Sequence, residues 1–250
     1  MRDELNPTYA PGRGRFDMWR HPILPLGALF LGAAMGGPAQ AGSPLVTEDA
    51  PVQAQGECQV DASWGRLASR TDGATRTLST QLSCGVGLRT QLALGYSDSR
   101  QQHDSTRSVL VAGKTSLTGP SEDGAGLSIA YGAPAERTAG SPTRMGDAFA
   151  TLAGTLPLTA QLLTHANVGW TGSHGNRSNT TRWALALEWA LRDNLSLVAE
   201  TFADDHDRKP WLAAGVSQKL SDTTSINASY GGQTRGAGRH TGTVGFTVGF

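Results

Sequence analysis

The sequence predicts an all-β protein: a closed, antiparallel, up-and-down transmembrane β-barrel of about twelve strands that follows an N-terminal signal peptide. Three observations support this fold class. Apolar and polar residues alternate with a period of two through most of the chain after residue 57. The connections between the alternating segments are short and long by turns. No apolar run in this region reaches the roughly 20 residues that a membrane-spanning helix needs.

The alternation is clearest at 182–191 and at 241–250. In the first stretch, RWALALEWAL, every second residue is Trp or Leu, and a helix would scatter these side chains around its circumference. In the second, TGTVGFTVGF, every second residue from 244 to 250 is Val or Phe. The same pattern predicts strands over 58–68, 77–86, 88–97, 107–117, 125–133, 147–156, 160–171, 181–191, 195–204, 211–220, 224–231 and 241–250.

The predicted connections follow a rhythm. After even-numbered strands they are short, as at 157–159 and 192–194, with 118–124 as the exception, whereas after odd-numbered strands they are longer, as at 133–146 and 172–180. Outer-membrane barrels have short periplasmic turns and longer extracellular loops, and closure leaves no unpaired sheet edge in lipid. A soluble β-sandwich would also alternate, and sequence alone does not say which face points inward.

The first 41 residues are typical of a secretory signal. The apolar run 22–37 is too short and too broken by Pro and Gly to span a membrane, and Ala39-Gln40-Ala41 matches a signal peptidase site. We therefore expect a signal peptide at 1–41, in which 1–17 are either a long leader or a non-native upstream extension. A periplasmic N-terminal segment at 42–57 and an outer-membrane barrel at 58–250 complete the expected organisation.

The two cysteines are placed to pair. Cys58 opens the first predicted strand and Cys84 lies near the end of the second, around a turn signal at Thr71-Asp72-Gly73. In such a hairpin the two side chains oppose each other, with Cβ atoms about 4.5–5.5 Å apart. Because the cell envelope is oxidising, we predict a Cys58–Cys84 disulfide near the periplasmic rim, with two free thiols as the alternative.

The face opposite the apolar stripe carries polar side chains of both charges. Twelve strands would enclose a narrow lumen, since about eight strands fill with side chains and 16–18 leave a wide channel. Charges lining a constriction would select small solutes, whereas paired charges that only fill the barrel would pass none. The predicted lumen and constriction residues are Asp61, Arg89, Gln91, Lys114, His165, Arg182, Glu188, Glu200, Lys219 and Asn227.

The stretches LVTEDA at 45–50 and GECQV at 56–60 resemble the opening of small proteobacterial outer-membrane barrels grouped with the phenol-degradation meta-pathway proteins. The spacing of Gly, Tyr and Phe toward the end of the chain is similar too. This resemblance implies a barrel of the transporter type and uptake of hydrophobic or aromatic solutes, and it supplies no catalytic residues. The terminal residues Phe246, Val248 and Phe250 resemble the signal that the barrel assembly machinery reads.

Composition excludes other classes of function. With 21 basic and 21 acidic side chains the chain is formally neutral, which argues against nucleic acid as a partner. No metal site or cofactor is predicted, because two cysteines cannot form a four-thiolate site. A lipid-hydrolysing barrel would need a Ser and a His close together near the rim, and His103-Asp104-Ser105 falls in a polar loop, so no enzyme is predicted.

We therefore predict a narrow passive channel for small solutes in the bacterial outer membrane. A non-conducting structural or surface-binding barrel is the alternative. The expected partners are outer-membrane lipid and lipopolysaccharide, the barrel assembly machinery during biogenesis, and a small permeant that the sequence does not identify.

Overall fold

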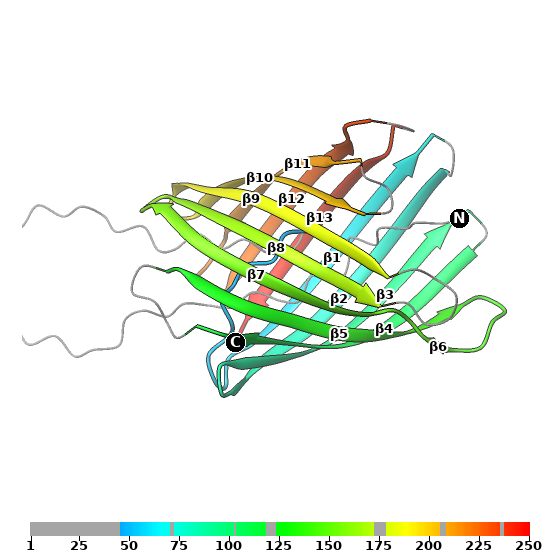
Figure 1. Ribbon diagram of the computed structural model, residues 1–250, viewed down its shortest axis with the longest axis horizontal. Coiled ribbons are helices and arrows are strands. Elements are labelled where there is room, and N and C mark those ends of the chain that lie inside the picture. The colour runs from blue at the N-terminus through cyan, green and yellow to red at the C-terminus, as the bar shows by residue number, and fades with distance from the viewer. Residues whose placement is uncertain are drawn as a thin grey trace, which may run out of the picture.

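The computed structural model describes residues 46–70, 73–102, 104–118, 124–172, 179–205, 209–235 and 238–250, and these residues form one closed barrel (Figure 1). The strands are β1 (Cys58–Ser69), β2 (Gly73–Gly87), β3 (Thr90–Gln101), β4 (Asp104–Ser116), β5 (Gly126–Thr138), β6 (Arg144–Met145), β7 (Ala148–Thr159), β8 (Leu162–Gly172), β9 (Thr180–Arg192), β10 (Leu195–Asp204), β11 (Trp211–Lys219), β12 (Thr224–Gln233) and β13 (His240–Gly249). Among the described residues, no helix is long and apolar enough to cross a membrane.

The barrel is an antiparallel meander of twelve long strands. Each long strand pairs with its neighbour along the chain, and the β1–β13 pairing closes the ring. At this seam the backbone N–H of Cys58 donates to the Phe250 carbonyl, and the N–H of Phe250 donates to the Cys58 carbonyl, both at 2.9 Å. Closure pairs the strand edges, as a lipid environment requires. The predicted fold class is thereby confirmed.

The two ends of the barrel differ. We call the end where Cys58 and Phe250 meet the terminal rim; it also carries the short β2–β3, β7–β8 and β9–β10 turns. The opposite end, the loop rim, carries the longer β5–β7 connection, which contains β6 and lies at the far right of Figure 1. The loop-rim connections after β5, β8, β10 and β12 are long as predicted, whereas β1–β2 (70–72) and β3–β4 (102–103) are short because their strands continue into the predicted loops.

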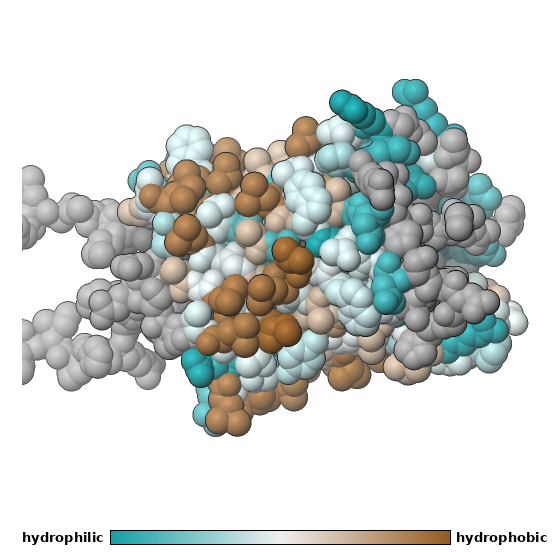
Figure 2. Space-filling view, in the orientation of Figure 1, coloured by the Kyte–Doolittle hydropathy of each residue, from teal (hydrophilic) through white to brown (hydrophobic). Residues whose placement is uncertain are grey.

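The orientation of the alternating faces is that of a membrane barrel. Trp189 is 50% exposed and Leu94 is 56% exposed, whereas the inward side chains of Gln91 and Glu188 are fully buried. Figure 2 shows apolar residues over the middle of the outer wall and hydrophilic residues gathered toward the loop rim. A soluble β-sandwich would bury its large apolar side chains, so this arrangement rules out the competing fold.

Some strands are longer than predicted, and the extra residues lie toward the loop rim. β2 begins at Gly73 rather than at 77, and β5 continues to Thr138 rather than ending at 133. In these extensions both faces are polar, so no alternation of hydrophobicity marks them. The two-residue strand β6 was not predicted for the same reason. The signal peptide and the turn residues Thr71 and Asp72 lie outside the described residues.

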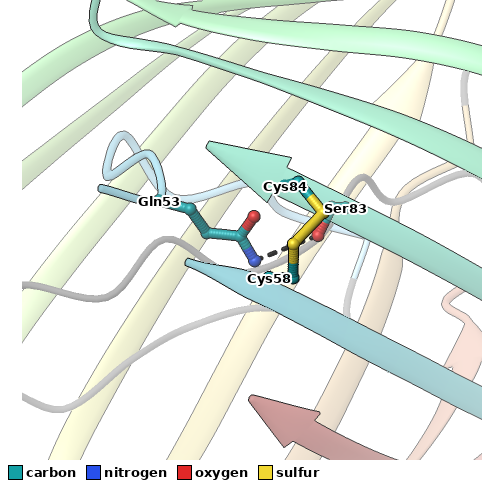
Figure 3. Close-up of a disulfide and its surroundings, with 4 residues drawn as sticks. All are labelled: Gln53, Cys58, Ser83 and Cys84. Atoms are coloured by element: carbon teal, nitrogen blue, oxygen red, sulfur yellow. Dashed lines mark hydrogen bonds between the residues drawn. A yellow bond between two sulfur atoms is a disulfide. The ribbon is translucent and has the colours of Figure 1, made fainter. Parts of the chain in front are cut away.

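The predicted disulfide is confirmed. Cys58 and Cys84 are directly opposite each other in the β1–β2 register, with Cα atoms 4.1 Å apart and their sulfur atoms bonded. Figure 3 shows the bond beside Ser83 and Gln53, close to where the chain enters β1. The first strand is thus covalently tied to the second at the terminal rim.

Candidate functional site

The residues that precede β1 lie inside the barrel. We call residues 46–57 the strap. Thr47 is fully buried, and Asp49 and Ala50 are each 2% exposed. Sequence analysis assigned 42–57 to a periplasmic segment before the barrel; the described part of that segment runs along the inner wall, because polar side chains of the wall satisfy its backbone groups.

The strap first bonds to β10 and β8. The carboxylate of Glu200 accepts hydrogen bonds from the N–H groups of Val46 and Thr47, and from the Thr47 hydroxyl at 2.8 Å. The Asn167 side chain accepts from the Glu48 N–H at 2.6 Å and donates to the Glu48 carbonyl at 2.9 Å. Asn167 therefore serves the strap as a neighbouring β-strand would.

A buried ion cluster joins the strap to β4. The ammonium of Lys114 lies 2.6 Å from the Asp49 carboxylate and 3.7 Å from that of Glu48. Glu48 Oε1 and Asp49 Oδ2 are buried without a hydrogen-bond partner among the described residues. The pKa of Glu48 is raised to about 8, mainly by burial; the nearby Lys114 opposes the rise, and the negative charge of Asp49 contributes to it.

Below the middle of the strap, three buried polar side chains lie in a row. The Ala50 N–H donates to Thr155 Oγ1 at 2.8 Å, and this hydroxyl lies 3.0 Å from His165 Nδ1. His165 Nε2 is 3.5 Å from the carboxylate of Glu188. A hydroxyl, an imidazole and a carboxylate in sequence can activate a nucleophile. Here the hydroxyl is occupied by the strap and covered by it, so the row positions the strap rather than facing a substrate.

The strap ends on β3 and β2. The Gln53 N–H donates to the Gln91 side chain at 2.9 Å, and the Gln53 amide donates to Ser83 at 3.0 Å (Figure 3). Gln55 then forms a parallel bridge with Gly85. A Cβ atom at Gly85 would overlap the Ala54 carbonyl, so only glycine permits this close approach.

The other side of the inner wall has small side chains. We call Ser63 on β1, Gly215 and Ser217 on β11, and Thr243 on β13 the small-residue wall. By alternation these residues point inward, and each is only partly buried. The strap hydrogen bonds described above all go to β2, β3, β4, β7, β8 and β10. The strap is therefore bonded to one side of the inner wall, the strap-covered side, and these four small, partly exposed residues lie on the other side, among buried residues such as Asp61 and Asn227.

Two apolar clusters lie on the inner face, and sequence analysis missed both. Phe202 on β10 stacks on Trp211 on β11, with ring centroids 5.8 Å apart and ring planes 7° from parallel, and Val46 and Leu67 pack against them. The second cluster is Ala93, Leu110, Ala112 and Phe149. Counting in steps of two from Glu200 places Phe202 on the inner face, so strict parity would have found it.

Most predicted lumen residues do face inward. Gln91, Lys114, His165, Glu188 and Glu200 come together beneath the strap, as described above. Asp61 and Asn227 are buried on the inner faces of β1 and β12, and Asp61 accepts from Gln59 at 2.8 Å and from Thr247 at 2.7 Å. Arg182 and Lys219 are partly buried on the inner faces of β9 and β11.

Arg89 is a correction. It was placed in the lumen by extending the alternation of β3 backward, but it lies exposed in the β2–β3 turn with a φ of 57°. The neighbouring Leu88 also has a positive φ, of 51°. A turn of this kind breaks the period of two, so parity cannot be carried through it.

A sealed β-cylinder with an apolar exterior and a hydrogen-bonded polar interior is an outer-membrane β-barrel. The model of the family described as uncharacterised conserved protein UCP029691 matches residues 29–250, and the chain belongs to this family. No curated protein matches the chain.

Solved outer-membrane barrels share the fold. The KdgM porin superposes with a TM-score of 0.56 at 12% identity, over 76% of this chain and 99% of that one. The NanC porin gives 0.52 at 10% identity, over 76% and 98%. The CymD monoaromatic hydrocarbon channel gives 0.50 at 10% identity, over 78% and 89%. The predicted outer-membrane barrel is thus confirmed, whereas the link to phenol degradation stays a prediction.

Proposed function

We propose that this protein is a narrow passive channel for small solutes. The observation that carries the proposal is the division of the inner wall: a solute would pass between the strap and the small-residue wall. Ser63, Ser217 and Thr243 offer hydroxyl groups to water there, and small side chains leave room that the strap-covered side does not. The barrel fold shared with two porins supports a role in passage.

The charges that a solute would meet follow from the same division. Lys219 and Arg182 are inward and only partly buried, whereas Glu188 is fully buried and Glu200 is bonded to the strap. We therefore assign charge selection to Lys219 and Arg182. Glu188 and Glu200, which were also predicted to line the constriction, lie beneath the strap. They would affect a permeant only by holding the strap in place.

The solute class is proposed to include small apolar or aromatic molecules. The stacked rings of Phe202 and Trp211 are buried with Val46 of the strap packed against them, so they would offer an apolar surface to a solute once the strap moves, and a purely aqueous channel does not need such a surface. The indole Nε1–H of Trp211 is buried without an acceptor among the described residues, and it would suit a hydroxyl oxygen of a solute. The printed name of CymD, a monoaromatic hydrocarbon channel, agrees with this class.

The partners and assembly signal are part of the proposal. The exposed outer wall would contact lipid, and the polar loop rim would contact lipopolysaccharide. Phe246 and Phe250 are 44% and 69% exposed at the end of the chain, on and directly after β13. The assembly machinery would recognise them together with Val248. These contacts stay predictions.

A non-conducting barrel is the second candidate. The backbone groups of the strap bond to five strands, and a strap that never leaves would favour a structural or surface-binding role.

Reconstitution of the purified barrel in planar bilayers tests the proposal, with solute flux into liposomes as a second readout. Discrete conductance steps and flux of a monoaromatic probe above that of a sugar of similar size are expected. Trp211→Ala should reduce the aromatic flux and leave the conductance nearly unchanged, whereas the outward Trp189→Ala serves as the matched control. Silent bilayers, with or without the strap, would contradict the channel.

A further inference from the structure

The strap is attached to the barrel mainly by side chains of the wall. We propose that residues 46–55 form a releasable gate: seated, they close the β2–β10 side of the lumen, and released, they open it. This inference rests on the proposed channel function. The strand pairing that closes the barrel does not depend on residues 46–55 being seated.

The attachment is made of separate hydrogen bonds rather than a β-ladder. Backbone N–H groups of the strap bond to the side chains of Glu200, Asn167, Thr155 and Gln91, one after another. The described strap joins a strand through its own backbone only at its end, beside Gly85. Water can replace each of these side-chain partners, because the net stabilisation from one such bond is modest.

The surface beneath the strap is mostly polar, and its apolar part is the Phe202–Trp211 pair against which Val46 packs. Gln91, Lys114, Ser83 and Glu188 are fully buried and His165 is 1% exposed, and all five can form hydrogen bonds with water. A permanent core element would usually cover apolar side chains, whose exposure opposes release. Release of the strap would instead hydrate groups that water solvates well.

The seated cluster at Lys114 is not fully compensated. Two carboxylates share one ammonium, and one oxygen of each carboxylate is buried without a hydrogen-bond partner in the described structure. Such a cluster stabilises the seated strap less than a matched pair would. This incomplete compensation lowers the free-energy cost of releasing the strap.

The strap has a hinge and an anchor. Gly56 has a φ of 85°, which favours glycine, and it lies two residues before the start of β1, the strand that the Cys58–Cys84 disulfide ties to β2 (Figure 3). Residues 46–55 can therefore leave the wall while residue 58 stays fixed.

Thiol labelling reports release without relying on conductance. In an Ala50→Cys barrel the new thiol is covered when the strap is seated, since residue 50 is 2% exposed. Adding Asn167→Leu removes both bonds to Glu48, at about fivefold in the equilibrium for each. We expect the labelling rate to rise on the order of tenfold or more. Asn227→Leu, on the buried inner face of β12, is the matched control and should leave the rate unchanged.

A cross-link fixes the seated state. A Cβ atom on Gly126 would lie 3.1 Å from that of Ala50, so Ala50→Cys with Gly126→Cys can form a disulfide after a small shift. Oxidation should hold the conductance at its lowest level, and reduction should raise it several-fold. Ala50→Cys alone, under the same reductant, controls for reduction of Cys58–Cys84.

The outcomes separate the two proposals. Faster labelling in Asn167→Leu together with conductance that follows the cross-link supports the gate. Equally slow labelling in both Asn variants, in a barrel that conducts, overturns the gate and leaves the channel standing. Fast labelling in a barrel that never conducts overturns the channel, and with it any gating role.

Discussion

The two sides of the inner wall differ in side-chain size and in what they contact. On β2, β3, β4, β7, β8 and β10 the strap bonds to polar side chains such as Gln91, Lys114 and Glu200, and these are almost completely buried. On the small-residue wall the inward residues are Gly, Ser and Thr, and they are partly exposed. The difference indicates that one side holds a segment in place while the other leaves room for a solute.

Removing the ammonium of Lys114 should have the largest effect on the stability of the seated strap and on the conductance. In Lys114→Met the carboxylates of Glu48 and Asp49 lose their buried cation, at a cost of about 3–5 kcal/mol to the seated strap. The strap should leave the wall and the conductance should rise several-fold, as bilayer recordings would measure. Asn227→Met, buried on the inner face of β12 away from the strap bonds, is the control and should change conductance little. Equal conductance in Lys114→Met and the wild type would show that the cluster does not hold the strap.

Raising the pH should also favour release of the strap, with a smaller effect than Lys114→Met. The seated pKa of Glu48 is about 8 against an ordinary value of 4.5, so protonation favours the seated strap. Seating is most favourable below about pH 4.5 and weakens as pH rises to about 8, with Lys114, Asp49 and Asp61 as the charged neighbours. Thiol labelling at residue 50, measured relative to a free cysteine at the same pH, should therefore speed up over that range.

Glu48→Gln is the control for this pH dependence. It cannot ionise, so labelling, divided by the rate of a free cysteine at the same pH, should become nearly constant between pH 4.5 and 8 while the barrel stays folded. A pH dependence that survives the substitution would assign the effect to another group.

A methyl group added at Gly85, where the strap meets β2, should have a moderate effect on the stability of the seated strap. In Gly85→Ala the new Cβ would overlap the Ala54 carbonyl, and relieving it should destabilise the seated strap by about 1–3 kcal/mol. Proteolysis or labelling of the strap would report the change. Gly154→Ala, where the nearest atom would be 3.7 Å away, is the control. Similar behaviour of the two variants would argue against a close approach at Gly85.

The effect on ion selectivity should be the smallest, and it should appear only when a charge on the side opposite the strap is removed. Lys219→Gln removes a partly exposed inward charge and should shift the reversal potential toward cations by several millivolts, a difference well below 1 kcal/mol in ion preference. Glu188→Gln, fully buried beneath the strap, should leave it unchanged. The opposite ranking would place the solute path on the strap-covered side.

The comparison also separates what the sequence could predict from what it could not. The period of two gave twelve long strands, and symmetry about the turn near residue 72 gave the Cys58–Cys84 pair, because both depend on neighbours along the chain. The strap has no such periodicity, and its partners are distant: Val46 bonds to Glu200, 154 residues away. Its place inside the barrel therefore had no local signal.

The inner-wall residues were predicted in part. Parity found Lys114, His165 and Glu188, whose positions follow from regular strands. It failed at Arg89, where two positive φ angles reverse the chain. Phe202 was missed for another reason: an apolar side chain was assumed to face lipid, whereas it stacks on Trp211 inside the barrel.

The most direct test follows current through single barrels while thiols are modified. In Ser217→Cys, on the small-residue wall, a charged thiol reagent should reduce the current promptly. In Ser128→Cys, fully buried on the inner face of β5, the same reagent should have no effect. Block at residue 128 without block at residue 217 would contradict the account, as would barrels that carry no current at all.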